Sequence, residues 1–82
     1  MKIFLSSLAD RQLRKLPSKM HQFLLARIEK LDEDPFPAGS KKLVNRVGWR
    51  IRIGDYRILY AVEAKKKELT ILSVAHRKEA YR

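Results

Sequence analysis

The stretch Trp49-Arg50-Ile51-Arg52-Ile53-Gly54-Asp55-Tyr56-Arg57-Ile58-Leu59-Tyr60 decides the fold of this 82-residue chain. From Trp49 to Ile53, basic and apolar residues alternate, as in a strand that exposes one face and buries the other. Gly54-Asp55 interrupts the alternation, and a second strand begins at Tyr56. Such a short connection between two strands is typical of a hairpin. We therefore predict an antiparallel pair of strands with arginines on one face.

The sequence on either side of this hairpin predicts the rest of a small α+β domain. A short strand is expected at Lys2–Leu5, and the three main strands at Arg46–Ile53, Tyr56–Glu63 and Glu68–Arg77. Between the last two strands, Lys65-Lys66-Lys67 is typical of a solvated hairpin loop. We expect all three main strands to pair in antiparallel order.

Two helices are expected between the first strand and the hairpin. Ser7 is a candidate N-cap, with Asp10 in the capping-box position, and Pro17 stops this first helix. The second helix is expected over about Ser18–Glu33, because its apolar residues recur every three or four positions. Those residues are Met20, Leu24, Ile28 and Leu31. The expected order over residues 1–82 is β-α-α-β-β-β, a single domain with an antiparallel sheet and two helices packed on one face.

Strand parity assigns each sheet residue to one of two faces. The residues expected to face the helices are Ile51, Ile53, Ile58, Tyr60, Leu72 and Val74. The residues expected on the opposite face are Arg50, Arg52, Arg57, Ser73, Ala75 and Arg77. Leu59, Leu69 and Ile71 also fall on this second face by parity, where a partner would have to cover them. The second face is therefore expected to be a cationic groove with room between the charges.

Composition and charge restrict the class of protein. The chain has 19 Lys and Arg against 9 Asp and Glu, a net charge of +10, and no cysteine, so disulfides and thiolate metal sites are excluded. Twelve of these cations fall in residues 41–82, which favours a nucleic acid or an acidic protein as partner. The apolar run at the N-terminus is too short for a signal peptide or a membrane span. We expect a cytoplasmic protein without a membrane partner.

The order of these motifs resembles the RelE/ParE toxin superfamily, and within it the RelE-like mRNA interferases of type II toxin–antitoxin systems. The matching segments are Arg50-Ile51-Arg52, Gly54-Asp55-Tyr56-Arg57-Ile58-Leu59-Tyr60, His76-Arg77 and Tyr81. Arg50 and Arg52 stand where the family commonly has lysine. Because arginine stays protonated in proteins, Arg52 can stabilise negative charge but is a poor general base.

The resemblance implies an endoribonuclease toxin that cuts messenger RNA in the ribosomal decoding site and so inhibits translation. It implies attack of an RNA 2′-hydroxyl on the adjacent phosphate, without a metal or other cofactor. The implied partners are a cognate antitoxin that covers the sheet face, the ribosome with its mRNA, and operator DNA only through the toxin–antitoxin complex.

Candidate site residues follow from the motifs and from the resemblance. The predicted catalytic residues are Arg57, Arg77, Tyr81 and Arg52, and the predicted RNA-binding residues are Arg50, Arg46, Lys42 and His76. We expect the Arg57 and Arg77 guanidinium groups to hold the scissile phosphate.

Each assignment has a structural alternative. Arg57 could form an ion pair with an acidic neighbour, Asp55 or Glu63, and Arg77 could be a surface charge near the chain end. By the resemblance, Tyr81 orients or deprotonates the 2′-hydroxyl or stacks on a base; the alternative is that it pins the C-terminal turn to the sheet. Parity places His76 on the helix side, which favours a structural histidine unless the strand twists at its end.

Two other functions stay open from the sequence. The first is a ParE-like protein that binds DNA gyrase and has no nuclease activity, although the resemblance implies that such chains generally lack the full basic set and the terminal tyrosine. The second is a small basic RNA-binding module without catalysis.

Overall fold

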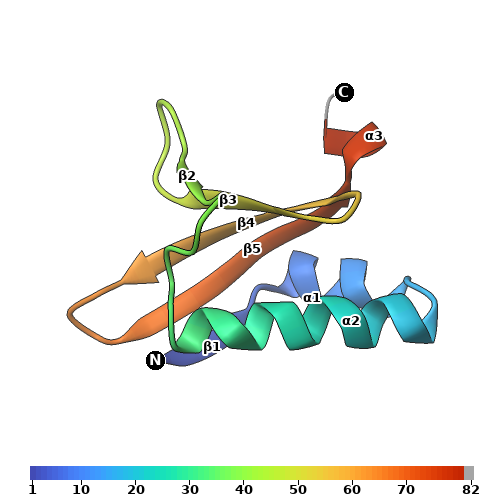
Figure 1. The fold of residues 1–82 in the computed structure, drawn as a ribbon, viewed down its shortest axis with the longest axis horizontal. Coiled ribbons are helices and arrows are strands. Elements are labelled where there is room, and N and C mark those ends of the chain that lie inside the picture. The colour runs from blue at the N-terminus through green and yellow to red at the C-terminus, as the bar shows by residue number, and fades with distance from the viewer. Residues whose placement is uncertain (81–82) are drawn as a thin grey trace.

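The computed structural model describes residues 1–80, which form a five-stranded sheet with two helices on one face (Figure 1). The strands are β1 (Lys2–Leu5), β2 (Lys41–Lys42), β3 (Trp49–Ile53), β4 (Tyr56–Glu63) and β5 (Glu68–His76). The helical elements are α1 (Ser7–Arg14), α2 (Ser18–Glu29), the 3₁₀ turn η1 (Lys30–Asp32) and the single turn α3 (Arg77–Ala80). Figure 1 shows α1 and α2 on one side of the sheet, and α3 on the other side at the end of β5.

The sheet order is β1-β5-β4-β3-β2, so the first strand lies beside the last. The pairs β3–β4 and β4–β5 are antiparallel, as predicted, but β1 pairs with β5 in parallel. The α+β fold with two helices on one face is confirmed, whereas the purely antiparallel sheet is corrected to a mixed one. Periodicity reveals that Lys2–Leu5 is a strand, but it does not reveal which strand lies beside it.

The segment before β3 also differs from the prediction. Strand β3 begins at Trp49 rather than at Arg46, and the two-residue strand β2 pairs with it at the sheet edge. A loop joins the two strands, closed by a hydrogen bond of 3.0 Å from the Leu43 N–H to the Gly48 carbonyl. Two consecutive lysines do not show the alternation of polar and apolar residues that predicts a strand, so β2 could not be identified from the sequence.

Helix α1 begins one residue earlier than the capping pattern indicated. Ser6, not Ser7, is the N-cap, and its hydroxyl accepts the Ala9 N–H at 3.0 Å. The same hydroxyl donates to the Leu72 carbonyl of β5 at 2.9 Å, so the cap also joins α1 to the sheet. Helix α2 ends at Glu29, and η1 continues the turn. Within residues 1–80, no helix combines the length and apolar character needed to span a membrane.

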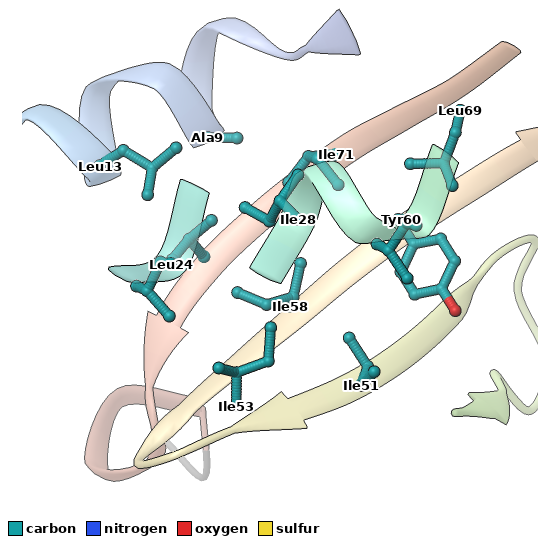
Figure 2. Close-up of a cluster of buried hydrophobic side chains, with 12 residues drawn as sticks. Ala9, Leu13, Leu24, Ile28, Ile51, Ile53, Ile58, Tyr60, Leu69 and Ile71 are labelled. Atoms are coloured by element: carbon teal, nitrogen blue, oxygen red, sulfur yellow. The ribbon is translucent and has the colours of Figure 1, made fainter. Parts of the chain in front are cut away.

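The core fills the space between the two helices and the sheet (Figure 2). Its buried residues are Ala9, Leu13, Leu24, Ile28, Leu31, Ile51, Ile53, Ile58, Tyr60, Leu69, Ile71 and Val74. The apolar stripe predicted for the second helix is confirmed, since Leu24 and Ile28 of α2 and Leu31 of η1 are buried. Met20 packs against this core. The parity assignment of β3 and β4 is confirmed as well, because Ile51, Ile53, Ile58 and Tyr60 all lie in this core.

The parity assignment of β5 is wrong before Ser73. Leu59 pairs with Ser73, but the next residue, Tyr60, pairs with Ile71, so Leu72 is the extra residue of a β-bulge. The bulge reverses the alternation, since one added residue moves every residue before it to the other face. Leu69 and Ile71 are consequently buried in the core, although parity placed them on the groove face. Leu72 was expected in the core and lies outside it.

Candidate functional site

The sheet face turned away from α1 and α2 contains a hollow of about 260 Å³ with a cationic lining. Its lining residues are Gly39, Lys41, Arg50, Ile51, Arg52 and Arg57. We call it the cationic hollow. It brings together three of the arginines predicted for the site, contributed by two neighbouring strands, and a lysine from the edge strand. No carboxylate is among these lining residues.

The register of the strands explains why these cations meet. Arg52 pairs with Arg57, and Lys41 pairs with Arg50, so each pair projects from the same face of the sheet. Like charges directly opposite each other on a sheet are destabilising. A bound anion between them would remove that cost. The arrangement therefore suits a phosphate group, which guanidinium binds through parallel hydrogen bonds.

The arginines differ in their surroundings. Arg57 and Arg50 are half-buried, whereas Arg52 is exposed and its Nε donates to the Gly54 carbonyl at 3.4 Å. Gly54 lies in the turn between β3 and β4. The hydrogen bond gives the Arg52 side chain a fixed contact at the turn of the hairpin. Partial burial restricts Arg50 and Arg57 further, so the hollow presents charge from a rigid sheet.

Lys41 is a site residue that the sequence analysis did not identify. The prediction named Lys42, but Lys42 pairs with Trp49, whose side chain packs against the core, so it lies on the opposite face from the hollow. Lys41 pairs with Arg50 and lines the hollow. Counting back from Arg50 would have selected Lys41 only if the edge strand β2 had been foreseen.

Arg46 is not among the residues that line the hollow, because it lies in the β2–β3 loop and is exposed. This loop rises from the sheet on the side away from α1 and α2 (Figure 1). Val44 and Val47 flank its tip and are 81% and 85% exposed. Arg46 is therefore placed to contact a ligand that extends beyond the hollow.

Arg77 is the first residue of α3, and its exposed side chain follows the end of β5. Its backbone N–H donates to the Asp55 carbonyl at 2.6 Å, which fixes the start of α3 against the β3–β4 turn. Arg77 is not among the residues that line the cationic hollow. Tyr81, predicted to be catalytic, lies outside the described residues.

His76 lies on the other face of the sheet, as parity indicated, and does not join the arginines. It pairs with Tyr56, and the two rings meet edge to face with centroids 5.2 Å apart. Both rings line a separate hollow of about 520 Å³ beside α1. The placement of His76 therefore does not support the predicted RNA contact through the cationic hollow.

The two aromatic residues at the other end of the β3–β4 pair hold the α2–β2 loop. The Tyr60 hydroxyl donates to the Pro35 carbonyl at 2.7 Å, and the Trp49 ring packs on Phe36 with centroids 4.5 Å apart. Burial raises the pKa of the Tyr60 phenol above its ordinary value of 10.0, with a smaller contribution from Asp34 and an opposing hydrogen bond with Ser40. Tyr60 therefore stays neutral and acts as a structural hydrogen-bond donor.

The cationic hollow can bind and polarise a phosphate, but its side chains supply no general base at neutral pH. Arginine stays protonated, and no histidine or carboxylate lines this hollow. Proton transfer from a ribose hydroxyl would need a group outside the hollow. Within residues 1–80, no three His, Asp or Glu side chains gather in a way that could hold a metal ion.

The sequence matches one protein-family model over nearly its whole length. Residues 3–81 match the model described as the ParE toxin of the type II toxin–antitoxin system parDE. A search of curated protein sequences found no significant match.

Solved structures of the same fold come from bacteria and archaea. A chain of the RelBE2 toxin–antitoxin complex from Mycobacterium tuberculosis is 26% identical, with a TM-score of 0.82 over 93% of this chain and 96% of the other. A chain of the archaeal RelE–RelB complex from Pyrococcus horikoshii is 27% identical, with a TM-score of 0.81 over 93% of each chain. The isolated RelE toxin of E. coli is 22% identical, with a TM-score of 0.78 over 98% of this chain and 94% of that one, and shows the shared fold.

Proposed function

This chain belongs to the ParE toxin family of type II toxin–antitoxin systems, and from this premise we propose that it is a ribosome-dependent endoribonuclease that inhibits translation. One observation carries the proposal: Lys41, Arg50, Arg52 and Arg57 line one hollow on the sheet face that α1 and α2 leave open. Such a site binds the RNA backbone strongly and supplies little acid–base chemistry. An enzyme of this kind needs a second macromolecule to position its substrate, and here we propose that the ribosome does so.

The proposed reaction is an internal transesterification of RNA. The ribose 2′-oxygen bonds to the adjacent phosphorus and loses its proton, while the bond from phosphorus to the 5′-oxygen breaks and that oxygen gains a proton. The products are a 2′,3′-cyclic phosphate and a 5′-hydroxyl. Because the nucleophile belongs to the RNA, the toxin has to orient the nucleotide, stabilise the phosphorane and assist two proton transfers.

The cationic hollow supplies the second of these contributions. Arg57, which is half-buried and lines the hollow, would hold the non-bridging oxygens, with Arg52 opposite it in the register. Arg50 and Lys41 would hold the flanking phosphates. Arg77, from α3, would approach the scissile phosphate from the end of β5. We keep Tyr81 as the candidate for orienting or deprotonating the 2′-hydroxyl.

A neutralising antitoxin is the protein partner of this proposal, and apolar residues outside the core support it. Phe4 is 46% exposed and pairs with Thr70, while Leu59 and Leu72 lie on the sheet outside the core. An antitoxin segment laid over this face would bury these side chains and neutralise the arginines together. Both partners would meet the toxin in the cytoplasm, and operator DNA would be bound only by the toxin–antitoxin complex.

Gyrase inhibition is the second candidate, because the matching family model is named for the ParE toxin. The four cations of the hollow favour the nuclease, since a protein that acts only by binding gyrase has no need of a phosphate site. The two functions predict different targets, so one pair of assays separates them.

The test adds the purified toxin to a cell-free translation reaction and, separately, to a gyrase supercoiling assay. We expect cuts in translated mRNA only when ribosomes are present, fragments ending in 2′,3′-cyclic phosphate, and normal supercoiling. Cleavage should persist in chelator as long as enough magnesium remains to keep ribosomes intact. Fragments that end in 3′-hydroxyls would contradict the reaction, and inhibited supercoiling with intact mRNA would select the gyrase candidate.

Salt dependence tests the phosphate site without catalysis. Four contacts to single-stranded RNA predict that log affinity falls with log salt at a slope of roughly −3, at about 0.7 per contact. Lys66→Ala, in the exposed β4–β5 loop, is the matched control and should leave the slope unchanged. A slope near zero would mean that the hollow does not bind RNA phosphates.

A further inference from the structure

The His76 side chain occupies the position of an N-cap for α3. Its Nδ1 accepts the backbone N–H of Lys78, the second residue of the helix, at 3.2 Å. The first N–H groups of a helix have no partner within the helix, and an N-cap side chain satisfies one of them. For Nδ1 to accept, the proton of the neutral ring must be on Nε2. Capping of α3 therefore depends on an unprotonated Nδ1.

The ring of His76 is held in place from the sheet side. Tyr56 of β4 meets it edge to face, and the β3–β4 turn accepts the Arg77 N–H through the Asp55 carbonyl. The first two N–H groups of α3 thus have partners from outside the helix. Because α3 is only one turn long, and so short a helix is marginal by itself, it depends on contacts from outside the helix such as these.

The charges near the imidazole are mostly positive. Lys15, the C-cap of α1, lines the same hollow as His76, and Arg77 and Lys78 follow His76 in the chain. Asp55 lies across the turn, and the Tyr56 phenol is the titratable group of β4 beside the ring. Protonation of Nδ1 would remove the acceptor and add a positive charge at the N-terminal end of a helix, where cations are unfavourable.

We propose that His76 is a positioning residue: its neutral imidazole caps α3 and so places Arg77, and protonation releases this turn. The capping stands on the hydrogen bond alone, whereas its consequence for RNA cleavage rests on the proposed function. Because only an unprotonated Nδ1 can accept the Lys78 N–H, α3 should be more populated at alkaline than at acidic pH.

The experiment follows α3 directly by NMR on the full-length toxin. Backbone ¹³Cα shifts of Arg77 and Lys78 are recorded from pH 8.0 to 5.0 in the wild-type chain, in His76→Asn and in His76→Leu. Asparagine can cap a helix without titrating, and leucine cannot cap at all. We expect the helical population of the wild-type turn to fall about fivefold across the range, that of His76→Asn to stay constant and high, and that of His76→Leu to stay constant and low.

Two results would overturn the proposal. One is a wild-type turn whose shifts do not change with pH, and the other is a His76→Asn turn as disordered as that of His76→Leu. Thermal unfolding of all three chains tests whether the core is intact. The wild-type pH series remains informative even if a variant fails to fold. In the cleavage assay, the wild-type rate should fall more steeply toward acidic pH than the His76→Asn rate. A pH-dependent turn in a chain that cleaves no RNA would refute the nuclease while supporting the cap.

Discussion

The two faces of the sheet are built from alternate residues of the same strands, yet they do different work. Along β3, Ile51 and Ile53 are buried under the helices, while Arg50 and Arg52 line the cationic hollow. In β4, Ile58 lies in the core beside Arg57, which faces the hollow. A difference of one position in the chain therefore separates a residue that stabilises the fold from one that serves the site. Substitutions on adjacent residues can test this division directly.

The largest effect on stability is expected from Ile58→Ala. Ile58 is fully buried, so its truncation should lower the free energy of unfolding by about 4 kcal/mol. Leu59→Ala, one position later and outside the core, should cost about 1 kcal/mol. Urea denaturation of the two variants measures the difference. Equal losses would show that the open face contributes to the core as much as the covered face does.

The largest effect on activity is expected from Arg57→Ala. Removal of one preorganised charge donor typically costs about 10²–10³ in rate, or roughly 3–4 kcal/mol of transition-state stabilisation. Primer extension on ribosome-bound mRNA measures the rate, and Lys66→Ala is the control with a normal rate. We expect a loss of at least about 10² for Arg77→Ala as well. Wild-type cleavage by Arg57→Ala would exclude it from the reaction.

Replacing glycine at the rim of the open face should lower the stability of the fold where the backbone requires glycine. Gly48 has a φ of +128°, and an added Cβ would lie 3.0 Å from the Tyr60 carbonyl oxygen and 3.2 Å from Leu43 Cδ1. Strain and crowding together predict that Gly48→Ala costs about 2–3 kcal/mol. Gly54→Ala, at φ +60° in open space, should cost about 1 kcal/mol. Thermal unfolding of the two variants measures both costs. An unchanged melting temperature for Gly48→Ala would mean that the β2–β3 loop relaxes to accommodate the added methyl group.

The smallest effect separates the two lysines of β2. Lys41→Ala should weaken RNA binding a few-fold and reduce the salt slope by about 0.7, because Lys41 lines the hollow. Lys42→Ala removes the same charge from the opposite face and should leave the slope nearly unchanged. Fluorescence anisotropy with a short RNA, at several salt concentrations, gives both values. If Lys42→Ala weakened RNA binding more than Lys41→Ala does, the RNA would have to bind the face of the sheet opposite the cationic hollow.

Most of the open face followed from the sequence because alternation is a local property of a strand. Arg50, Arg52 and Arg57 could be assigned to one face by counting from Trp49 to Tyr60, and Leu24 and Ile28 by counting along the helix. The α+β architecture followed from the order of these patterns. The proposal of a phosphate site also came from the sequence, because arginines in neighbouring strands place several guanidinium groups on one face.

Only the tertiary structure decided the features that depend on distant neighbours. The bulge at Leu72 moved both Leu69 and Ile71 from the predicted open face to the core face. No local pattern marks this bulge, because it is defined only by the pairing of β5 with β4. The parallel position of β1, the site lysine at 41 rather than 42, and the cap of His76 on Lys78 arose in the same way. Periodicity along a chain determines which side of its own strand a residue occupies. Register, neighbours and caps are set by long-range pairing, and the chain adopts them only when it folds.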